Sequence, residues 1–257
     1  MSDSPQEQEI KALGLILLRT GSMLMSNGAS TARIRMTIDR IANNFGYDAD
    51  LFITHRALTL SLSDKDNDHT FSSLKRTDPQ GVNFKIVSGI SRMSWSVKEH
   101  GWSFEQIEKE LDRLTSIPHY PRLVLLSLVA LAGASFCGLA GGNPLAMCIC
   151  FAASFIGLFV RQEAHKRQFN IYLCVFFAAF TAAMFAGSFC KLYPNSNLET
   201  AFATSVLFLI PGVPLINSFT DLFDGNILNG MLRIVHGLII AFMIALGLVC
   251  SIAIYKF

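Results

Sequence analysis

The residues best suited to chemistry in this 257-residue chain are concentrated after position 210. Asn217 and Asp221 stand four residues apart, which places an amide and a carboxylate on one face of a helix. Further polar or small residues follow within the next twelve positions: Asp224, Gly225, Asn226, Asn229, Gly230 and Arg233. Because apolar runs flank this segment, we expect it to bind a substrate or ion, with Asp221 as the partner of a proton or an amine. The alternative is that Asp221 and Asp224 lie in a loop and pair with Arg233 to fix a turn.

A break in the helix is predicted just before these residues. Pro211 and Pro214 each remove a helical hydrogen bond, which frees the carbonyl groups four residues back at Leu207 and Ile210. Irregular backbone within a bilayer is tolerated only where protein or water covers it, and paired helix breaks are typical of transporter binding sites. The predicted pathway residues are Pro211, Gly212, Pro214, Asn217 and Asp221, with Asp224, Gly225, Gly230 and Arg233 in support.

Long apolar runs must position this segment. Residues 123–160 form an uncharged run of 38 residues, interrupted by a Gly-Gly-Asn-Pro turn at 141–144, and three more uncharged runs of 21 to 23 residues follow. A helix needs about 20 apolar residues to cross about 30 Å of hydrocarbon. The sequence therefore predicts an α-helical polytopic membrane protein with five transmembrane helices, at about 123–141, 143–160, 169–190, 200–220 and 234–255.

Charge divides the chain into two predicted domains, 1–118 and 119–257. Residues 1–122 hold 15 of the 21 Lys and Arg and 15 of the 19 Asp and Glu. Cations just before the first span and at 161–167 predict that the amino-terminal domain is cytoplasmic. The polar, acidic start predicts that there is no cleavable signal peptide. The net charge of +2 has no basic block behind it, which argues against a nucleic-acid partner and leaves the lipid bilayer as the expected environment.

The amino-terminal domain is predicted to be α+β. Apolar spacing indicates a helix ending at residues 27–28 and another from residue 30 or 31 to Gly46. Residues 51–63 alternate in polarity and form a predicted hairpin with residues 69–76, closed by a solvated turn at 64–68. Two further helices are expected at about 88–99 and from Ser103 to about 114. The side of the first strand predicted to face the core carries Phe52, Leu58, Leu60 and Leu62.

The start of the second helix is a candidate cytoplasmic anion site. A helix amino terminus with a hydroxyl cap and a nearby arginine attracts anions. A turn followed by an ordinary helix cap accounts for the same residues, and the sequence alone leaves both interpretations open. The residues concerned are Gly28, Ser30, Thr31 and Arg33.

The sequence predicts no catalytic residue, cofactor or metal. All six cysteines lie in the predicted spans or at their ends, and the six histidines show no ligand spacing. His55, in a predicted strand, is expected to be structural. The chain contains neither a phosphate-binding loop nor a nucleophile elbow, so coupling to ATP and enzymatic function are both disfavoured.

Small residues recur every fourth position in two of the predicted spans. The first span carries Ala130, Ala134, Gly138 and Gly142, and the third carries Ala179, Ala183 and Gly187. Such ladders let helices approach closely. We expect these spans to pack against each other, against a different subunit or against another copy of this chain.

The spacing of residues 211–233, Pro-Gly-x4-Asn-x3-Asp-x3-Gly-x4-Gly-x2-Arg, resembles the signature of the threonine/serine exporter family. The Asn-Gly-Ala-Ser-Thr-Ala-Arg segment at 27–33 and the order of a soluble domain before five spans are similar too. The split members of this family, which act with a separately encoded small membrane protein, are the most similar in organisation. The resemblance implies efflux of threonine, serine or succinate across a bacterial inner membrane, by a chain that needs a second integral membrane subunit.

Two classes of function fit these observations. The first is a subunit of a secondary exporter, driven by the proton gradient or by the gradient of its own substrate. The second is a membrane-anchored enzyme or sensor whose soluble domain carries the activity. One plain anchor would suffice for the second class, so five spans with a broken polar helix favour the exporter.

Overall fold

The computed structural model describes residues 5–54, 56–64, 69–77, 81–118, 120–194, 196 and 198–256. By its internal contacts the chain forms two compact units, Met1–Pro118 with Val213–Ile234, and His119–Gly212 with Val235–Phe257. His55 and most of the acidic turn at 64–68 lie outside the described residues. The predicted domain boundary after residue 118 stays a prediction.

Two helices begin the first unit, as their apolar spacing predicts. Helix α1, Pro5–Ser26, is followed by Gly28 at φ 87°, a left-handed conformation that glycine adopts without a steric cost. Helix α2, Thr31–Asn44, begins at the cap residue Ser30, whose hydroxyl accepts a hydrogen bond from the Arg33 backbone N–H. The predicted turn and cap at residues 27–31 are therefore confirmed.

A three-stranded antiparallel sheet follows, in the order β1 (Asp48–Ile53), β2 (Ala57–Ser63), β3 (Thr70–Arg76). The predicted hairpin of β2 with β3 is present, but a second turn separates β1 from β2. There the Thr54 N–H donates to the Ala57 carbonyl at 2.9 Å. Ile53 pairs with Leu58, so the placement of Phe52 on the core side was wrong: Phe52 pairs with Thr59 on the opposite face and is exposed.

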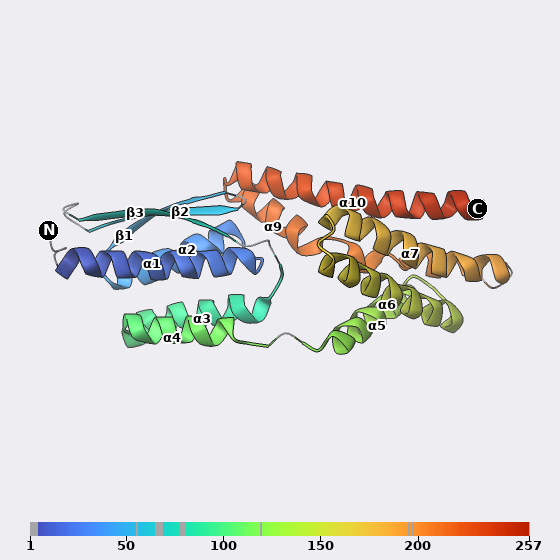
Figure 1. The fold of residues 1–257 in the computed structure, drawn as a ribbon, viewed down its shortest axis with the longest axis horizontal. Helices are drawn as coiled ribbons and strands as arrows, with labels where there is room; N and C mark the ends of the chain where they lie inside the picture. Colours follow the sequence, from blue (N-terminus) through green and yellow to red (C-terminus); the bar gives the residue numbers. More distant parts are fainter. Residues whose placement is uncertain are drawn as a thin grey trace. The chain divides into compact units, whose positions relative to one another are not determined.

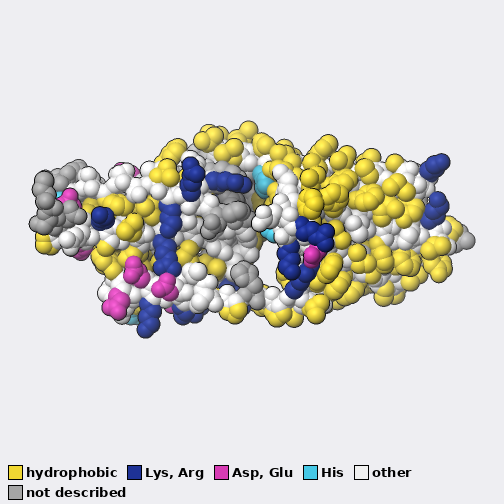
Figure 2. Space-filling view, in the orientation of Figure 1, with side chains coloured by type: hydrophobic (Ala, Val, Ile, Leu, Met, Phe, Trp, Pro, Cys, Tyr) yellow, Lys and Arg dark blue, Asp and Glu magenta, His cyan; other side chains and the backbone are white. Residues whose placement is uncertain are grey.

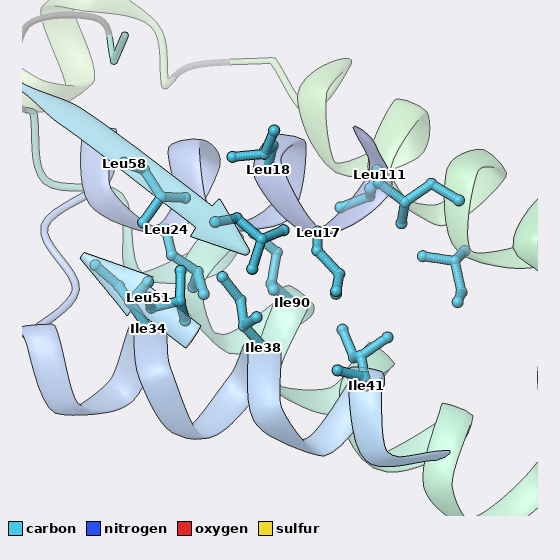
Figure 3. Close-up of a cluster of buried hydrophobic side chains, with 14 of the residues drawn as sticks. Leu17, Leu18, Leu24, Ile34, Ile38, Ile41, Leu51, Leu58, Ile90 and Leu111 are labelled. Carbon is cyan, nitrogen blue, oxygen red and sulfur yellow. The ribbon is translucent and has the colours of Figure 1, made fainter. Parts of the chain in front are cut away.

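Helices α3, Phe84–His100, and α4, Phe104–Thr115, complete the first unit's amino-terminal part. Ser103 and Gln106 form the predicted capping box of α4. The sheet, the α1–α2 pair and the α3–α4 pair form three layers (Figure 1). Apolar side chains from every layer meet in one core, as Leu17, Ile38, Leu58, Ile90 and Leu111 show in Figure 3.

The second unit contains α5, Arg122–Leu139, α6, Pro144–Lys166, and α7, Ile171–Leu192, together with most of α10, Ile227–Tyr255. These four helices are long and apolar enough to cross a membrane, and a bent pair, Glu199–Leu209 with Gly212–Phe223, makes up to five. Hydrophobic side chains make up most of the visible face of this unit (Figure 2). The protein is therefore a multi-pass helical membrane protein with an amino-terminal α+β region.

Small residues set the packing of the second unit. Ala178, Ala179, Ala182, Ala183 and Ala186 on α7 are all fully buried. A Cβ atom added to Gly157 of α6 would meet the Ala178 carbonyl oxygen at 3.0 Å, and one added to Gly247 of α10 would meet the Phe180 nitrogen at 2.8 Å. Helix backbones thus touch where the predicted ladder of the third span lies.

Candidate functional site

The fourth hydrophobic run is interrupted, as its prolines predict. Helix α8, Glu199–Thr204, leads into a single 3-10 turn, Leu207–Leu209, and helix α9 begins only at Gly212. Pro214 lies within the first turn of α9, where its missing N–H costs no hydrogen bond. The carbonyl groups of Leu207 and Ile210 accept from the Ile210 N–H at 3.1 Å and the Gly212 N–H at 2.9 Å, so local bonds satisfy both.

Helix α9 presents its polar face to the loop between α1 and α2. The Asn217 amide donates to the Gly28 carbonyl at 2.8 Å, and Asp221 Oδ1 accepts from the Thr31 N–H at 3.0 Å. The four-residue spacing of Asn217 and Asp221 therefore works as the sequence predicts, with both side chains on one face. Their partners lie about 190 residues earlier and belong to the other candidate site. Structure thus brings the two predicted sets of residues together.

Arg233 on α10 completes a buried ionic cluster. Its Nη1 lies 3.0 Å from Asp221 Oδ2, and its Nη2 donates to the Ala29 carbonyl at 3.2 Å. The Asp221 and Arg233 side chains are 0% and 8% exposed. Nη1 and Oδ2 are close without good hydrogen-bond alignment, so Coulomb attraction holds that contact. Removing one member of such a pair leaves an uncompensated buried charge, which costs about 3–5 kcal/mol.

The predicted anion site at the start of α2 holds a carboxylate from the chain itself. Asp221 accepts the Thr31 N–H at the positive end of α2, where the helix dipole favours a negative charge. Ser30 serves as the helix cap, and Gly28 supplies the carbonyl group that Asn217 contacts. Arg33 is exposed. Its backbone N–H contributes to the cap, so the turn-and-cap interpretation accounts for these residues.

The turn between α9 and α10 favours glycine at two of the predicted supporting positions. Gly225 has φ 79°, and a Cβ atom on Gly230 would meet the Ser218 carbonyl oxygen at 2.9 Å, so α10 passes close to α9 there. Asp224 is exposed in this turn. The Asn226 N–H bonds to the Asp221 carbonyl and closes the end of α9. Helix α10 begins at Ile227, seven residues before the predicted span, and the Gly230 N–H donates to the Asn226 carbonyl at 3.0 Å in its first turn.

The sequence analysis left Asn229 without a role and did not single out Arg35. The Asn229 amide donates to the Ile53 carbonyl at 2.9 Å and ties α10 to the end of β1. Arg35 follows Thr31 by four residues and lies on the same face of α2, but this spacing alone does not indicate a site. Within the described part of the chain, no group of three or more potential metal ligands is present.

Comparison with known proteins finds relatives over nearly the whole length of this chain. No solved structure matches this chain. The probable succinate transporter subunit YjjP of Escherichia coli (strain K12) is 28% identical over 252 residues, which cover 97% of each chain. The protein of the same name from Klebsiella aerogenes is 26% identical over 97% of this chain and 96% of its own. Pheromone-regulated membrane protein 10 of Kluyveromyces lactis is 25% identical over 93% of this chain, which spans 25% of that protein.

A family model, ThrE, described as "Putative threonine/serine exporter", matches residues 15–255. The match extends from α1 to the end of α10 and includes every residue of the buried ionic cluster. It confirms the resemblance seen in the spacing of residues 211–233. The chain belongs to the ThrE family of threonine/serine exporters.

Proposed function

We propose that this chain is a subunit of a secondary exporter of small hydrophilic metabolites, with a succinate-like dicarboxylate as the substrate. The observation that carries the proposal is the buried cluster of Asn217, Asp221 and Arg233, which follows a broken apolar helix in a member of an exporter family. Buried ionisable groups next to membrane spans are costly and are retained where they serve transport. The names of the two bacterial relatives support a dicarboxylate.

In this proposal the segment around the helix break forms part of the pathway. Pro211, Gly212 and Pro214 interrupt the helix, and Asn217 and Asp221 change partners as substrate passes. Asp221 exchanges its contact with Arg233 or Thr31 for a proton, which couples efflux to the proton gradient. Asp224 and Gly225 in the following turn, and Gly230 and Arg233 on α10, support this segment.

The proposed assembly includes a second, small integral membrane subunit. Support comes from the relatives, which are named as transporter subunits. Exposed small residues on α5, namely Ser127, Ala132 and Ser135, would allow close contact with such a partner or with another copy of this chain. We propose the bacterial inner membrane as the location, with the amino-terminal region in the cytoplasm. The cations before α5 and at 161–167 support that orientation.

The function is tested by transport into inverted membrane vesicles. Vesicles that contain this chain, the small partner subunit, both or neither are given labelled succinate, threonine or serine. The proposal predicts succinate uptake only when both subunits are present and a proton gradient is imposed. The family description makes threonine and serine the second candidate substrates, and uptake of these two alone would replace succinate. Absence of uptake of all three compounds by both subunits together would reject the exporter and favour a membrane-anchored enzyme or sensor.

The orientation in the membrane is tested separately with one introduced cysteine. Ser72 on β3 is exposed, so Ser72→Cys should react in inverted vesicles with a maleimide that cannot cross membranes. The same reagent should leave it unmodified in intact spheroplasts. Because Cys148 is also exposed, each result is compared with the parent chain under the same conditions. Reaction of the introduced cysteine in spheroplasts would reverse the proposed orientation.

A further inference from the structure

A pocket of about 260 Å³ lies in the first unit, next to the buried ionic cluster. Helix α2, strand β1 and the turn between α9 and α10 form its walls. Thr31 links it to the cluster, because this residue lines the pocket and its backbone N–H donates to Asp221. The lining consists of Thr31, Arg35, residues 51–53 and residues 225–229.

The polar groups around this pocket favour an anion. Arg35 is the charged residue among the described lining residues, and none of them is acidic. Helix α10, which has 29 residues, begins at Ile227 in the pocket wall. The first backbone N–H groups of a helix have no partner within the helix, and the positive end of its dipole lies there. Asp221 does not oppose an incoming anion strongly, because Arg233 offsets its charge.

Thr31 provides an independent sign of a missing ligand. The residue is 1% exposed, and its hydroxyl has no hydrogen-bond partner among the described residues. A buried hydroxyl without a partner is costly, and native proteins rarely leave one without a reason. Rotation about the Cα–Cβ bond exchanges the hydroxyl and methyl positions of threonine, so the hydroxyl can turn toward an acceptor in the pocket. A ligand oxygen would supply that acceptor.

We propose that this pocket binds a carboxylate group of the exported metabolite, held by the Arg35 guanidinium, the Thr31 hydroxyl and the first N–H groups of α10. The volume is below the range of about 300–1,000 Å³ typical for drug-sized ligands, which fits a metabolite of a few carbon atoms. This inference rests on the proposed exporter function and assigns it an intake site. The assignment differs from the predicted anion site, since Arg35 and not Arg33 supplies the cation.

Direct binding tests the site without requiring transport. The full chain is placed in nanodiscs of zwitterionic lipid, and binding of labelled succinate is measured for the parent and for Arg35→Gln, Thr31→Val and Arg92→Gln. Arg92 is the matched control, because it is an exposed arginine on α3 that lines a different hollow. Loss of a charge-assisted bond predicts weaker binding by about tenfold or more for Arg35→Gln, and loss of a neutral bond by about two- to tenfold for Thr31→Val. Arg92→Gln should bind as the parent does.

Three results would overturn the carboxylate site. The first is unchanged succinate binding in both Arg35→Gln and Thr31→Val. It would mean that the Thr31 hydroxyl is unpartnered without serving a ligand. The second is displacement of succinate by inorganic phosphate at equal concentration, which would indicate an unspecific anion site. The third is loss of succinate binding in nanodiscs of anionic lipid, which would assign the pocket to a lipid headgroup.

The same variants separate this inference from the proposed function. If vesicles with both subunits export succinate and Arg35→Gln exports it with unchanged apparent affinity, the intake site is wrong and the exporter stands. If the parent chain binds succinate through Arg35 while no vesicle transports it, the site stands and the transport proposal fails. Thermal unfolding of each variant is measured in parallel, and Thr31→Val should be at least as stable as the parent, because it removes an unpartnered polar group.

Discussion

Two regions of this chain are stabilised in opposite ways. One is the polar hairpin, which consists of α9 and the start of α10. The other is the bundle of α5, α6 and α7. The hairpin is tied to the loop between α1 and α2 by a buried ion pair and by side-chain bonds to backbone groups. The bundle is held by alanine and glycine contacts that let helix backbones touch. Both regions belong to the part of the chain after residue 121, where charged side chains are few.

This contrast indicates where each region can change shape. A close-packed alanine interface loses van der Waals contact as soon as the helices separate, so it favours one arrangement. A buried ion pair can change partners only when another charged or polar group takes the vacated place, because an uncompensated buried charge costs about 3–5 kcal/mol. In the proposed function we therefore assign the contacts that change during transport to the hairpin, and the rigid frame to the bundle.

The largest expected effect comes from removing one member of the ion pair. Asp221→Asn leaves Arg233 buried without a counter-charge, and Arg233→Gln does the same to Asp221. Each should lower the free energy of unfolding by about 3–5 kcal/mol. Thermal unfolding in detergent and membrane abundance measure this loss. The exposed Asp224→Asn, in the same turn, is the control and should have nearly the parent's stability.

The double variant Asp221→Asn with Arg233→Gln sharpens this prediction. It leaves no unpaired buried charge, so it should be less destabilised than the sum of the two single variants. Strict additivity of the two losses would show that the charges do not act as a pair.

Overpacking of the bundle should have the second largest effect. Ala130 on α5 is fully buried, so Ala130→Leu forces the helices apart and should cost about 1–3 kcal/mol. Ala132 is exposed on the same helix, and Ala132→Leu is the matched control. Thermal unfolding of the two variants compares them directly. Equal stability of both would mean that small residues do not set the packing of this region.

Asn217→Ala should have a smaller effect on folding. It removes one hydrogen bond, to the Gly28 carbonyl, and leaves the ion pair intact. The expected loss is about 0.5–1.5 kcal/mol, measured by thermal unfolding in detergent. A loss as large as that of Asp221→Asn would mean that the amide and the ion pair form one inseparable structural unit.

The smallest expected effect lies at the Glu110–Arg113 pair on the surface of α4. A hydrogen bond from Arg113 lowers the pKa of Glu110 below its usual value of 4.5. A lowered carboxyl pKa contributes stability above the unfolded-state pKa, and this contribution is lost as pH falls through the lowered value. Glu110→Gln should therefore unfold at a slightly lower temperature than the parent at pH 7, and this difference in unfolding temperature should disappear toward pH 3. A difference that persists there would exclude the ion pair as its cause.

Composition and periodicity predicted most of the fold. Apolar length defined α5, α6 and α7, and the turn and cap at residues 27–31 were readable from Asn27, Gly28 and Ser30. The turn between β1 and β2 was missed because residues 54–56 contain neither glycine nor proline, the usual turn signals. The start of α10 was misplaced because the span was predicted from an uncharged run, and the charged Arg233 lies inside the helix.

Only part of the candidate site could be predicted from the sequence. The spacing of Asn217 and Asp221 indicated one shared face, and the pairing of Asp221 with Arg233 stood among the alternatives. Their contacts with Gly28, Ala29 and Thr31 depend on tertiary packing across about 190 residues, which no local pattern contains. Arg35 was missed for the same reason, because the wall that faces it comes from β1 and the distant turn before α10.

Transport by Asn217→Ala is the most direct test of the central claim, that the polar hairpin serves export. Inverted vesicles carry the small partner subunit with either the parent chain or Asn217→Ala at matched abundance, and labelled succinate uptake is followed under an imposed proton gradient. The account predicts that the parent pair transports succinate and that the folded Asn217→Ala pair loses most of this activity. Parent-level transport by the Asn217→Ala pair would contradict it.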